Sequence, residues 1–330
     1  MKNKTSFSAS IITHCRAYHA EHDDPRIFND YLAGSLLTEE ERANFDRMTY
    51  KSIKVLYFIC SRQTVPAIIR FFLPRYYTRT FAAIAPRDPK LISNQAATVD
   101  WYMHAHGALA LSISRSRYTE DRLLEALGKG VTQYVILGAG MDTFAFRHLE
   151  LMNKLRVFEV DLSATQAIKR QRLKELGWEI PEELHFVPVD LTSQRLDEAL
   201  INASYDPKVP SFFNWLGVTY YLPIETVYDT LRTIAGIAPQ GSTVIFDYLD
   251  TDVFDPAKAA PRGQWLLWSS AGEKIKSGFD PATLNNDLAD LGLRLIENLG
   301  PENIEERYFR GHPGGYHAQE HAHLACVVVE

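Results

Sequence analysis

The sequence predicts an α/β fold in which a doubly wound, mostly parallel seven-stranded sheet of Rossmann-like type follows a helical N-terminal section. Three observations predict this fold. From about residue 129 onward, apolar runs of strand length alternate with segments of helix length. The first run breaks into Gly138-Ala139-Gly140, a turn where the backbone can approach a ligand closely. The next run ends in acid, at Glu159 and Asp161, where such a sheet binds the hydroxyls of a ribose.

Length and composition limit the class of protein. The 330 residues, 46% of them hydrophobic and 23% charged, are enough to bury a full α/β core with a smaller added layer. The net charge is −6 and the basic residues are scattered, so we expect no nucleic-acid partner. The strongest apolar run, residues 55–60, is too short to span a membrane, and no signal-peptide pattern is visible. We therefore expect a cytoplasmic protein with no membrane partner.

Cysteine and histidine spacing favours neither disulfides nor a metal centre. Cys15, Cys60 and Cys326 are too few and too far apart for a disulfide framework or a zinc site. Four histidines near the C-terminus follow no helical or finger-like spacing, and glycines separate some of them: His312, His317, His321 and His323. We expect no metal.

Residues 1–128 are predicted to form a helical section that packs on the core as a lid. Little in this stretch is typical of a strand, and Thr38 followed by three glutamates is typical of a helix N-terminus. A last helix over 121–127 ends at Gly128. Prolines divide the section into helices of modest length: Pro66, Pro74, Pro86 and Pro89.

The core, predicted for residues 129–330, alternates strands with helices. Strands are predicted over 133–137, 156–160, 185–189, 211–216 and 243–248. Helices are predicted from residue 142 and over 164–176, 195–203 and 224–238, so consecutive strands run parallel. A helix over 281–291 and two strands, 293–298 and 322–329, complete the sheet with an antiparallel edge.

Residues 250–278 interrupt this alternation and are predicted to form a cap. The segment has no strand pattern and contains Trp265 and Trp268. An insertion after the fifth strand lies over the carboxyl ends of the strands, where ligands bind. We expect the two tryptophans, with Tyr220 and Tyr221 after the fourth strand, to line an apolar substrate pocket.

The glycine turn favours a cofactor with a ribose and no pyrophosphate. The dinucleotide fingerprint needs a third glycine three residues after the second, and Thr143 stands there instead. S-adenosylmethionine has a ribose and no phosphate, so we predict it as the cofactor. Two alternatives stay open: an NAD-dependent oxidoreductase, for which we find no hydride-site signature, and a non-catalytic binding protein with the same fold.

Five motifs, taken in order, give the chain a resemblance to a known family. They are Arg115-Ser-Arg-Tyr-Thr-Glu-Asp, Val135-Ile-Leu-Gly-Ala-Gly-Met-Asp-Thr, Phe158-Glu-Val-Asp-Leu, Val187-Pro-Val-Asp-Leu and Tyr220-Tyr-Leu-Pro. In this order they resemble the leucine carboxyl methyltransferase group of class I S-adenosylmethionine-dependent methyltransferases. The resemblance runs from about residue 10 to the C-terminus and implies the class I methyltransferase fold.

The resemblance implies a set of cofactor-binding residues. An arginine that holds the methionine carboxylate falls on Arg115, where a guanidinium offers a bidentate grip. The ribose acid falls on Asp161, with Glu159 as the second candidate. The adenine contacts fall on Asp190 and Leu191, although Asp190 can also cap the helix that follows. The full expected set is Arg115, Gly138, Ala139, Gly140, Asp142, Glu159, Asp161, Asp190, Leu191, Trp215 and Leu216.

One departure from the family pattern concerns the acceptor. Many members carry a glutamate at the end of strand four, in a pattern like Glu-Gly-Leu-x-x-Tyr-Leu, whereas this chain has Leu216 at the acidic position. The departure argues against carboxyl methylation of a protein leucine and favours a small metabolite. We therefore expect methyl transfer to a carboxylate or hydroxyl oxygen of a small molecule.

The need for a catalytic base depends on the acceptor. A carboxylate is ionised at neutral pH and needs no base, whereas a hydroxyl needs one within hydrogen-bond distance. The candidate bases in this chain are His104, His106, His321, His323 and Tyr221. Each of them is also explained as an ordinary surface, loop or core side chain.

Overall fold

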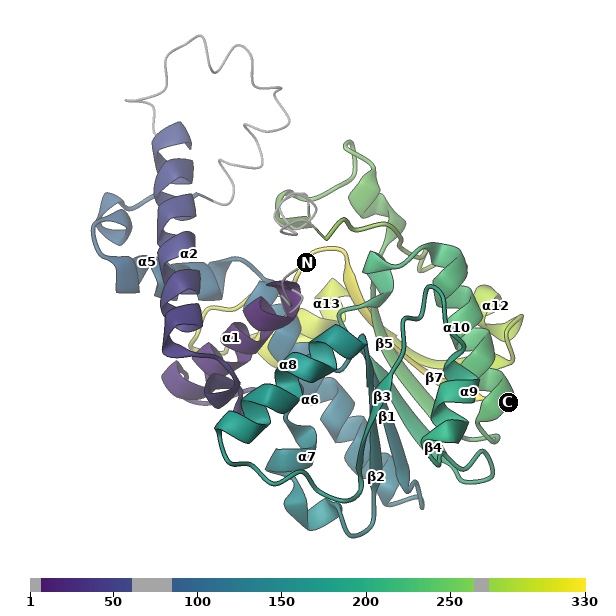
Figure 1. Ribbon diagram of the computed structural model, residues 1–330. Helices are drawn as coiled ribbons and strands as arrows, with labels where there is room; N and C mark the ends of the chain where they lie inside the picture. Colours follow the sequence, from purple (N-terminus) through teal and green to yellow (C-terminus); the bar gives the residue numbers. More distant parts are fainter. Residues whose placement is uncertain (1–6, 61–84, 264–272) are drawn as a thin grey trace.

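A seven-stranded sheet forms the centre of the molecule. The computed structural model describes residues 7–60, 85–263 and 273–330, and the statements that follow concern these residues. The strand order is β3-β2-β1-β4-β5-β7-β6 (Figure 1). The pairings among β1 to β5 are parallel, and β7 pairs antiparallel with both β5 and β6. The predicted doubly wound sheet with an antiparallel edge is confirmed.

The strands lie where the apolar runs predict them. Because both faces of this sheet are covered by helices, its central strands are continuous apolar runs rather than alternating ones. All five residues of β1 (Gln133–Leu137) are buried, as are all five of β4 (Ser211–Trp215). The other strands are β2 (Arg156–Asp161), β3 (Leu184–Pro188), β5 (Thr243–Leu249), β6 (Leu293–Leu299) and β7 (Ala322–Val329).

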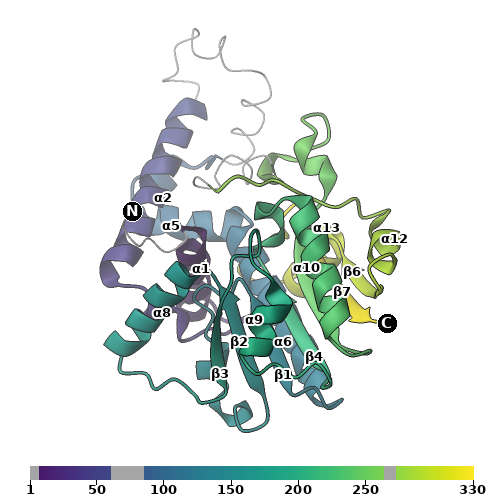
Figure 2. The same ribbon diagram turned by 45° about the vertical axis from the view of Figure 1, so that its right-hand side comes forward.

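Helices cover both faces of the sheet (Figure 2). A separate apolar core is buried on each side. One face packs against α1 (Phe7–His22), α6 (Ala108–Leu127), α7 (Phe144–Arg147), α8 (Ser163–Glu175) and α13 (Pro301–Ile304). The opposite face packs against α9 (Leu196–Asn202), α10 (Ile224–Ile237) and α12 (Leu284–Ala289).

Two predicted helices differ in length from the structure. The helix expected over 121–127 is only the last part of α6. This helix begins much earlier, at Ala108, directly after Gly107 with φ +67°. Tertiary packing buries its polar residues Ser112 and Ser114, so the helix lacks a simple amphipathic pattern. The helix expected from residue 142 is the single turn α7, followed by the 3-10 turn Leu149–Leu151.

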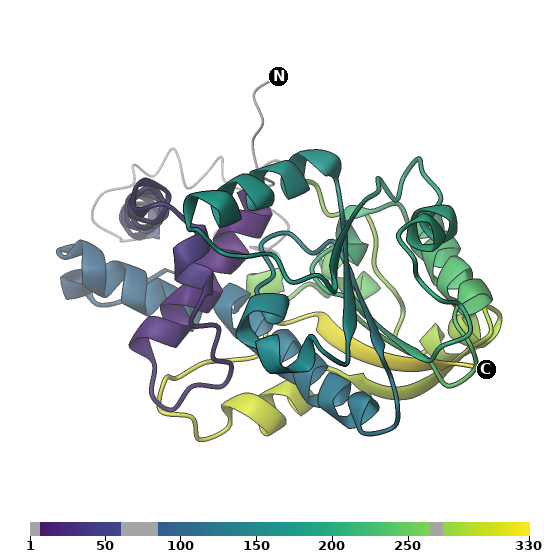
Figure 3. The same cartoon turned by 60° about the horizontal axis from the view of Figure 1, so that its bottom comes forward.

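The described part of the N-terminal section is helical, as predicted. Besides α1 and α6 it contains η1 (Ala33–Leu36), α2 (Glu39–Cys60), η2 (Pro89–Ile92) and α5 (Gln95–Ala105). Thr38 and Glu41 form a reciprocal cap, with the Thr38 N–H donating to Glu41 Oε2 (2.7 Å) and the Glu41 N–H to Thr38 Oγ1 (3.1 Å). Figures 1 and 3 show α2 standing to one side of the sheet. No helix in the described ranges is long and apolar enough to cross a bilayer.

The return limb of the predicted cap lies against the loop after β4. The Lys276 N–H donates to the Tyr220 carbonyl (2.7 Å), and Ser277 Oγ donates to the Thr219 carbonyl (3.1 Å). The outgoing limb contains η5 (Thr251–Phe254). Trp265 and Trp268 lie outside the described residues, as do Pro66 and Pro74.

A buried polar cluster joins the N-terminal section to the segment before β7. Asp23 contacts His19 Nδ1 (2.6 Å), His104 Nε2 (3.0 Å) and the hydroxyl of Tyr316. His19 Nε2 accepts from the Ile27 N–H (2.9 Å), which fixes the loop after α1. Burial opposes ionisation of Asp23, but the hydrogen bonds from His104, His19 and Tyr316 outweigh it and lower the pKa of this carboxyl.

We predict that His104 stabilises the fold more below neutral pH than above it. Burial favours the neutral ring, but the bond to Asp23 outweighs burial and raises the pKa of His104. Stabilisation by the charged ring is therefore fully present below the ordinary pKa of about 6.5 and is lost as pH rises through the raised value. In thermal unfolding, His104→Gln should lower Tm by a few degrees more at about pH 5.5 than at about pH 8.5.

The exposed His317, which contacts Glu305 at the surface, provides the control. His317→Gln should show the pH dependence of the unaltered protein. An equal loss of Tm at both pH values in His104→Gln would show that this ring acts through packing and not through its charge.

Candidate active site

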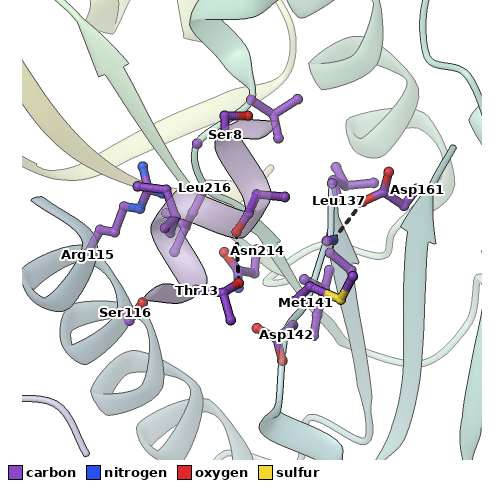
Figure 4. A pocket seen from close by; sticks show the side chains of 18 of the residues that line it. Ser8, Thr13, Arg115, Ser116, Leu137, Met141, Asp142, Asp161, Asn214 and Leu216 are labelled. Atoms are coloured by element: carbon purple, nitrogen blue, oxygen red, sulfur yellow. Dashed lines mark hydrogen bonds between the residues drawn. The ribbon is translucent and has the colours of Figure 1, made fainter. Parts of the chain in front are cut away.

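A cavity of about 530 Å³ opens at the carboxyl ends of β1, β2 and β4. These three strands are neighbours, and β1 and β4 lie on the two sides of the point where the strand order reverses, which is where open α/β sheets bind ligands. Residues from α1 and α6 form its walls above the strand ends (Figure 4). The sequence analysis missed the contribution of α1, whose lining residues include Ser8, Ile12, Thr13 and Arg16.

The glycine turn after β1 lines the cavity in a conformation that suits glycine. Gly138 has φ +68° and Gly140 has φ +53°. A Cβ added to Gly138 would lie 2.2 Å from Cγ2 of Val218. The N–H groups of Gly138 and Ala139 donate to the Val160 carbonyl (2.7 and 3.2 Å), which ties the turn to β2. The turn therefore presents bare backbone to the cavity at a fixed position.

Asp161 ends β2 and faces the same cavity. Its Oδ2 accepts from the Gly140 N–H (2.6 Å) and its Oδ1 from the Leu162 N–H (2.7 Å). Burial raises the pKa of this carboxyl, and the two backbone donors oppose that rise. Since a carboxylate has about four acceptor sites, Asp161 retains capacity for ligand hydroxyls.

Glu159, the second candidate for the ribose, lies away from the cavity. It is 1% exposed and contacts Lys169 Nζ at 2.6 Å. Lys169 Nζ also donates to the Asp142 carbonyl (2.6 Å), so this buried pair supports the glycine turn from behind. The structure therefore corrects the expectation for Glu159: residues two apart share a strand face, but only Asp161 is at the strand end.

The expectation for Trp215 is also corrected by its position. Neighbouring residues on a strand face opposite sides of the sheet, and here Leu216 lines the cavity while Trp215 points to the other side. Its side chain is fully buried in the core beneath α9 and α10. It therefore lies outside the cavity.

Arg115 on α6 reaches the end of β4. Its Nη1 donates to Asp247 Oδ2 (2.6 Å) and to the hydroxyl of Tyr220 (3.2 Å). Asp247 Oδ1 accepts from the Gly217 N–H (2.6 Å), so one carboxylate holds both the guanidinium and the loop after β4. A Cβ on Gly217 would lie 2.6 Å from Nη2 of Arg115, and φ is +75° there. The sequence analysis missed Asp247 and Gly217.

Asp190 and Leu191 line the opposite end of the cavity, after β3. Asp190 Oδ1 accepts from the Thr192 N–H (2.9 Å) and hydroxyl (2.6 Å), and these bonds lower the pKa of Asp190. The carboxylate thus closes a turn; it does not cap α9, which begins at Leu196. Both bonds to Thr192 are made by Oδ1 of Asp190, and Oδ2 of this carboxylate takes part in neither of them.

Tyrosines line the end of the cavity near Arg115. Tyr220 and Tyr221 come from the single 3-10 turn η4 (Thr219–Tyr221), and Leu111 packs with them. Burial raises the pKa of Tyr221 to about 12. Glu273, from the return limb of the cap, also lines the cavity and contacts the hydroxyl of Ser8.

The four histidines considered as candidate bases lie outside the cavity. His104 belongs to the Asp23 cluster, and His321 and His323 share the carboxylate of Asp250 (2.8 and 3.2 Å). Burial lowers the pKa of His106 to about 3. None of the four lines the cavity as far as the described residues define it.

The cavity brings together most of the predicted site. The predicted residues that line it are Arg115, Gly138, Ala139, Gly140, Asp142, Asp161, Asp190, Leu191, Leu216, Tyr220 and Tyr221. Two polar residues that the analysis did not single out also line it, Thr119 on α6 and Asn214 on β4. Asn214 carried a signal that could have identified it, because it is a lone amide within the apolar run of β4.

Comparison with known proteins adds independent information. A family model described as leucine carboxyl methyltransferase matches residues 9–235. The chain is 32% identical over 329 residues, 99% of each chain, to the Bacillus subtilis protein YktD, whose name assigns it to the S-adenosyl-L-methionine-dependent methyltransferases. A similarly named Mycobacterium tuberculosis protein is 32% identical over 165 residues, 47% of this chain and 54% of its own length.

Solved structures with a similar arrangement have low sequence identity. A DUF574 family protein from Streptomyces avermitilis has a TM-score of 0.49 at 16% identity, covering 78% of this chain and 96% of that one. Magnesium protoporphyrin IX methyltransferase from Synechocystis, solved with bound S-adenosylhomocysteine, has a TM-score of 0.43 at 11% identity, covering 80% and 99%.

We predict that the two acids of β2 have separable roles. Asp161→Asn should weaken binding of S-adenosylmethionine by roughly tenfold or more, because hydrogen bonds to a charged acceptor are the stronger kind. Isothermal titration calorimetry measures this change.

Glu159→Gln is the matched change two residues away. It should lower the free energy of unfolding by roughly 3 kcal/mol, since it removes the charge opposite buried Lys169, and should alter cofactor affinity far less. Equal losses of affinity in the two variants would contradict the assignment of the ribose to Asp161 alone.

Proposed function

Because the chain belongs to the leucine carboxyl methyltransferase family and is an S-adenosylmethionine-dependent methyltransferase, we propose that it methylates the hydroxyl oxygen of a small molecule. The observation that carries this proposal is the cavity itself. It has the expected cofactor residues along the strand ends and tyrosines beside Arg115, within one cavity lined by α1, α6 and Glu273. A cavity of this size suits a small acceptor better than a protein chain.

The residues present fit the cofactor. The glycine turn presents backbone without side chains to the cavity, and Asp161 and Asp190 offer acceptors for the ribose hydroxyls and the adenine amine. Arg115 offers donors for the methionine carboxylate. S-adenosylmethionine, when bound, supplies a methyl group already activated on a sulfonium. The main task of the chain is therefore to hold the acceptor oxygen in line with that methyl group.

The charge of the cavity favours a hydroxyl over a carboxylate acceptor. The described lining residues include six carboxylates and three guanidiniums. Such an excess of negative charge attracts a sulfonium and repels an anionic acceptor. The carboxylates are Asp30, Glu120, Asp142, Asp161, Asp190 and Glu273, and the guanidiniums are Arg16, Arg115 and Arg147.

A hydroxyl acceptor needs a group that takes its proton, and we assign this role to Glu273. It lines the cavity close enough to Tyr221 to help raise the pKa of that phenol, although burial contributes more. It is also in contact with Ser8, at the start of α1. Tyr221 itself, with a pKa near 12, is a weak base in its neutral form at neutral pH.

The acceptor class is tested by measuring S-adenosylhomocysteine formation with matched pairs of aromatic and aliphatic alcohols and carboxylic acids. We expect turnover with hydroxyl compounds, aromatic ones above all, because tyrosines line the acceptor end. Turnover of the acids alone would overturn the hydroxyl assignment. Tight binding of S-adenosylmethionine with turnover of neither class would show that the acceptor lies outside both classes.

We predict that Glu273→Gln lowers kcat by roughly a hundredfold while the affinity for S-adenosylmethionine stays within about twofold. The conservative change keeps the side-chain volume but removes the basic carboxylate. Tyr221→Phe should retain kcat within about threefold, because the phenol does not take the proton. Full activity in Glu273→Gln would exclude this carboxylate as the base.

A further inference from the structure

Two buried polar atoms in the cavity have no hydrogen-bond partner among the described residues. They are Oδ1 of Asn214 and Oγ1 of Thr119. The side chains are 6% and 1% exposed, and both residues line the cavity. Unpaired buried polar atoms are costly and uncommon in folded proteins, so two of them in one cavity point to a ligand with hydrogen-bond donors.

The two atoms belong to α6 and β4, which contact each other and both line the cavity. Thr119 lies one helical turn after Arg115 on α6, so the two residues share a face of that helix. Asn214 lies two residues before Leu216 on β4, so these two share a face of the sheet. Figure 4 shows Asn214 in the middle of the cavity lining, between Arg115 and Asp142 in this view.

Tyr134 anchors the Asn214 amide. Its Nδ2 donates to the hydroxyl of Tyr134 (2.8 Å), and the Tyr134 ring contacts Phe144 and Phe212 edge to face. With Nδ2 occupied, Oδ1 is the acceptor that remains for a ligand. The Thr119 hydroxyl can accept as well.

We propose that Asn214 Oδ1 and Thr119 Oγ1 accept hydrogen bonds from the α-ammonium group of the methionine part of S-adenosylmethionine. An ammonium group has three N–H donors and no acceptor, so it needs partners of this kind. In an α-amino acid the ammonium and carboxylate are attached to one carbon, so their binding sites must be adjacent. The inference rests on the cofactor site proposed above, in which Arg115, one helical turn from Thr119, holds the carboxylate.

Two of the lining carboxylates already have guanidinium partners. Glu120 pairs with Arg147, and Asp30 pairs with Arg16. At the end of β4, Leu216 is apolar where the family resemblance leads us to expect a glutamate. Asn214 supplies a polar group on the same strand face, two residues deeper. The ammonium group is therefore bound by neutral acceptors in this chain.

The test compares two ligands by calorimetry: S-adenosylhomocysteine and its analogue in which hydrogen replaces the α-amino group. The unaltered protein should bind the analogue roughly tenfold or more weakly, because hydrogen bonds to a charged group are lost. Asn214→Leu and Thr119→Val remove the acceptors with little change in shape. Each should weaken binding of S-adenosylhomocysteine but not of the analogue, so that the ratio of the two affinities falls toward one.

Ser112→Ala provides the matched control. Ser112 is a fully buried residue of α6 whose hydroxyl also has no partner among the described residues, but it does not line the cavity. This variant should keep the ratio of the unaltered protein. If Asn214→Leu does not fold, as judged by thermal unfolding, Thr119→Val carries the test alone.

An unchanged ratio in a folded Thr119→Val or Asn214→Leu protein would overturn the proposal. A failure of the cofactor site itself gives a different result. In that case Asp161→Asn and Arg115→Lys would leave the affinity for S-adenosylhomocysteine unchanged, and the unaltered protein would not distinguish the two ligands.

Discussion

The attachment of the glycine turn to the end of β2 is the constraint on which the rest of the site depends. Asp161 accepts the Gly140 N–H, the Val160 carbonyl accepts two further N–H groups of the turn, and Lys169 holds the Asp142 carbonyl from behind. A turn with positive φ at two residues has no regular ladder of its own, so these bonds decide its shape. The cavity floor is rigid because two strand ends and a buried ion pair hold it.

Helix α1 of the N-terminal section forms a wall of the cavity beside this turn. Arg16 donates to the Met141 carbonyl (2.9 Å), and a Cβ on Gly140 would lie 3.4 Å from Cβ of Ala9, so α1 packs directly on the turn. The Asp23 cluster then fastens α1 to α5 and to Tyr316. Residues from both parts of the chain thus make one binding surface, and neither part contains all of it.

Local patterns in the sequence predicted the strands, the glycine turn and the acids at the strand ends, because each depends on neighbours close in the chain. Trp215 and Glu159 were expected at the cofactor but lie outside the cavity, because strand face and depth depend on the exact strand end. The part that α1 plays could not be predicted, since it depends on packing between residues more than a hundred positions apart, such as Arg16 and Met141. Asn214 was overlooked although its lone amide was visible.

The excess of carboxylates in the cavity has a consequence for turnover. Methyl transfer converts the sulfonium of the cofactor into a neutral thioether, while the six carboxylates and three guanidiniums around it stay in place. The electrostatic part of binding therefore weakens at the moment of reaction, although the adenosine and amino-acid parts of the cofactor are unchanged. The charge of the cavity therefore favours the reactant over the spent cofactor, so the reaction itself removes part of the attraction that holds the cofactor in the site.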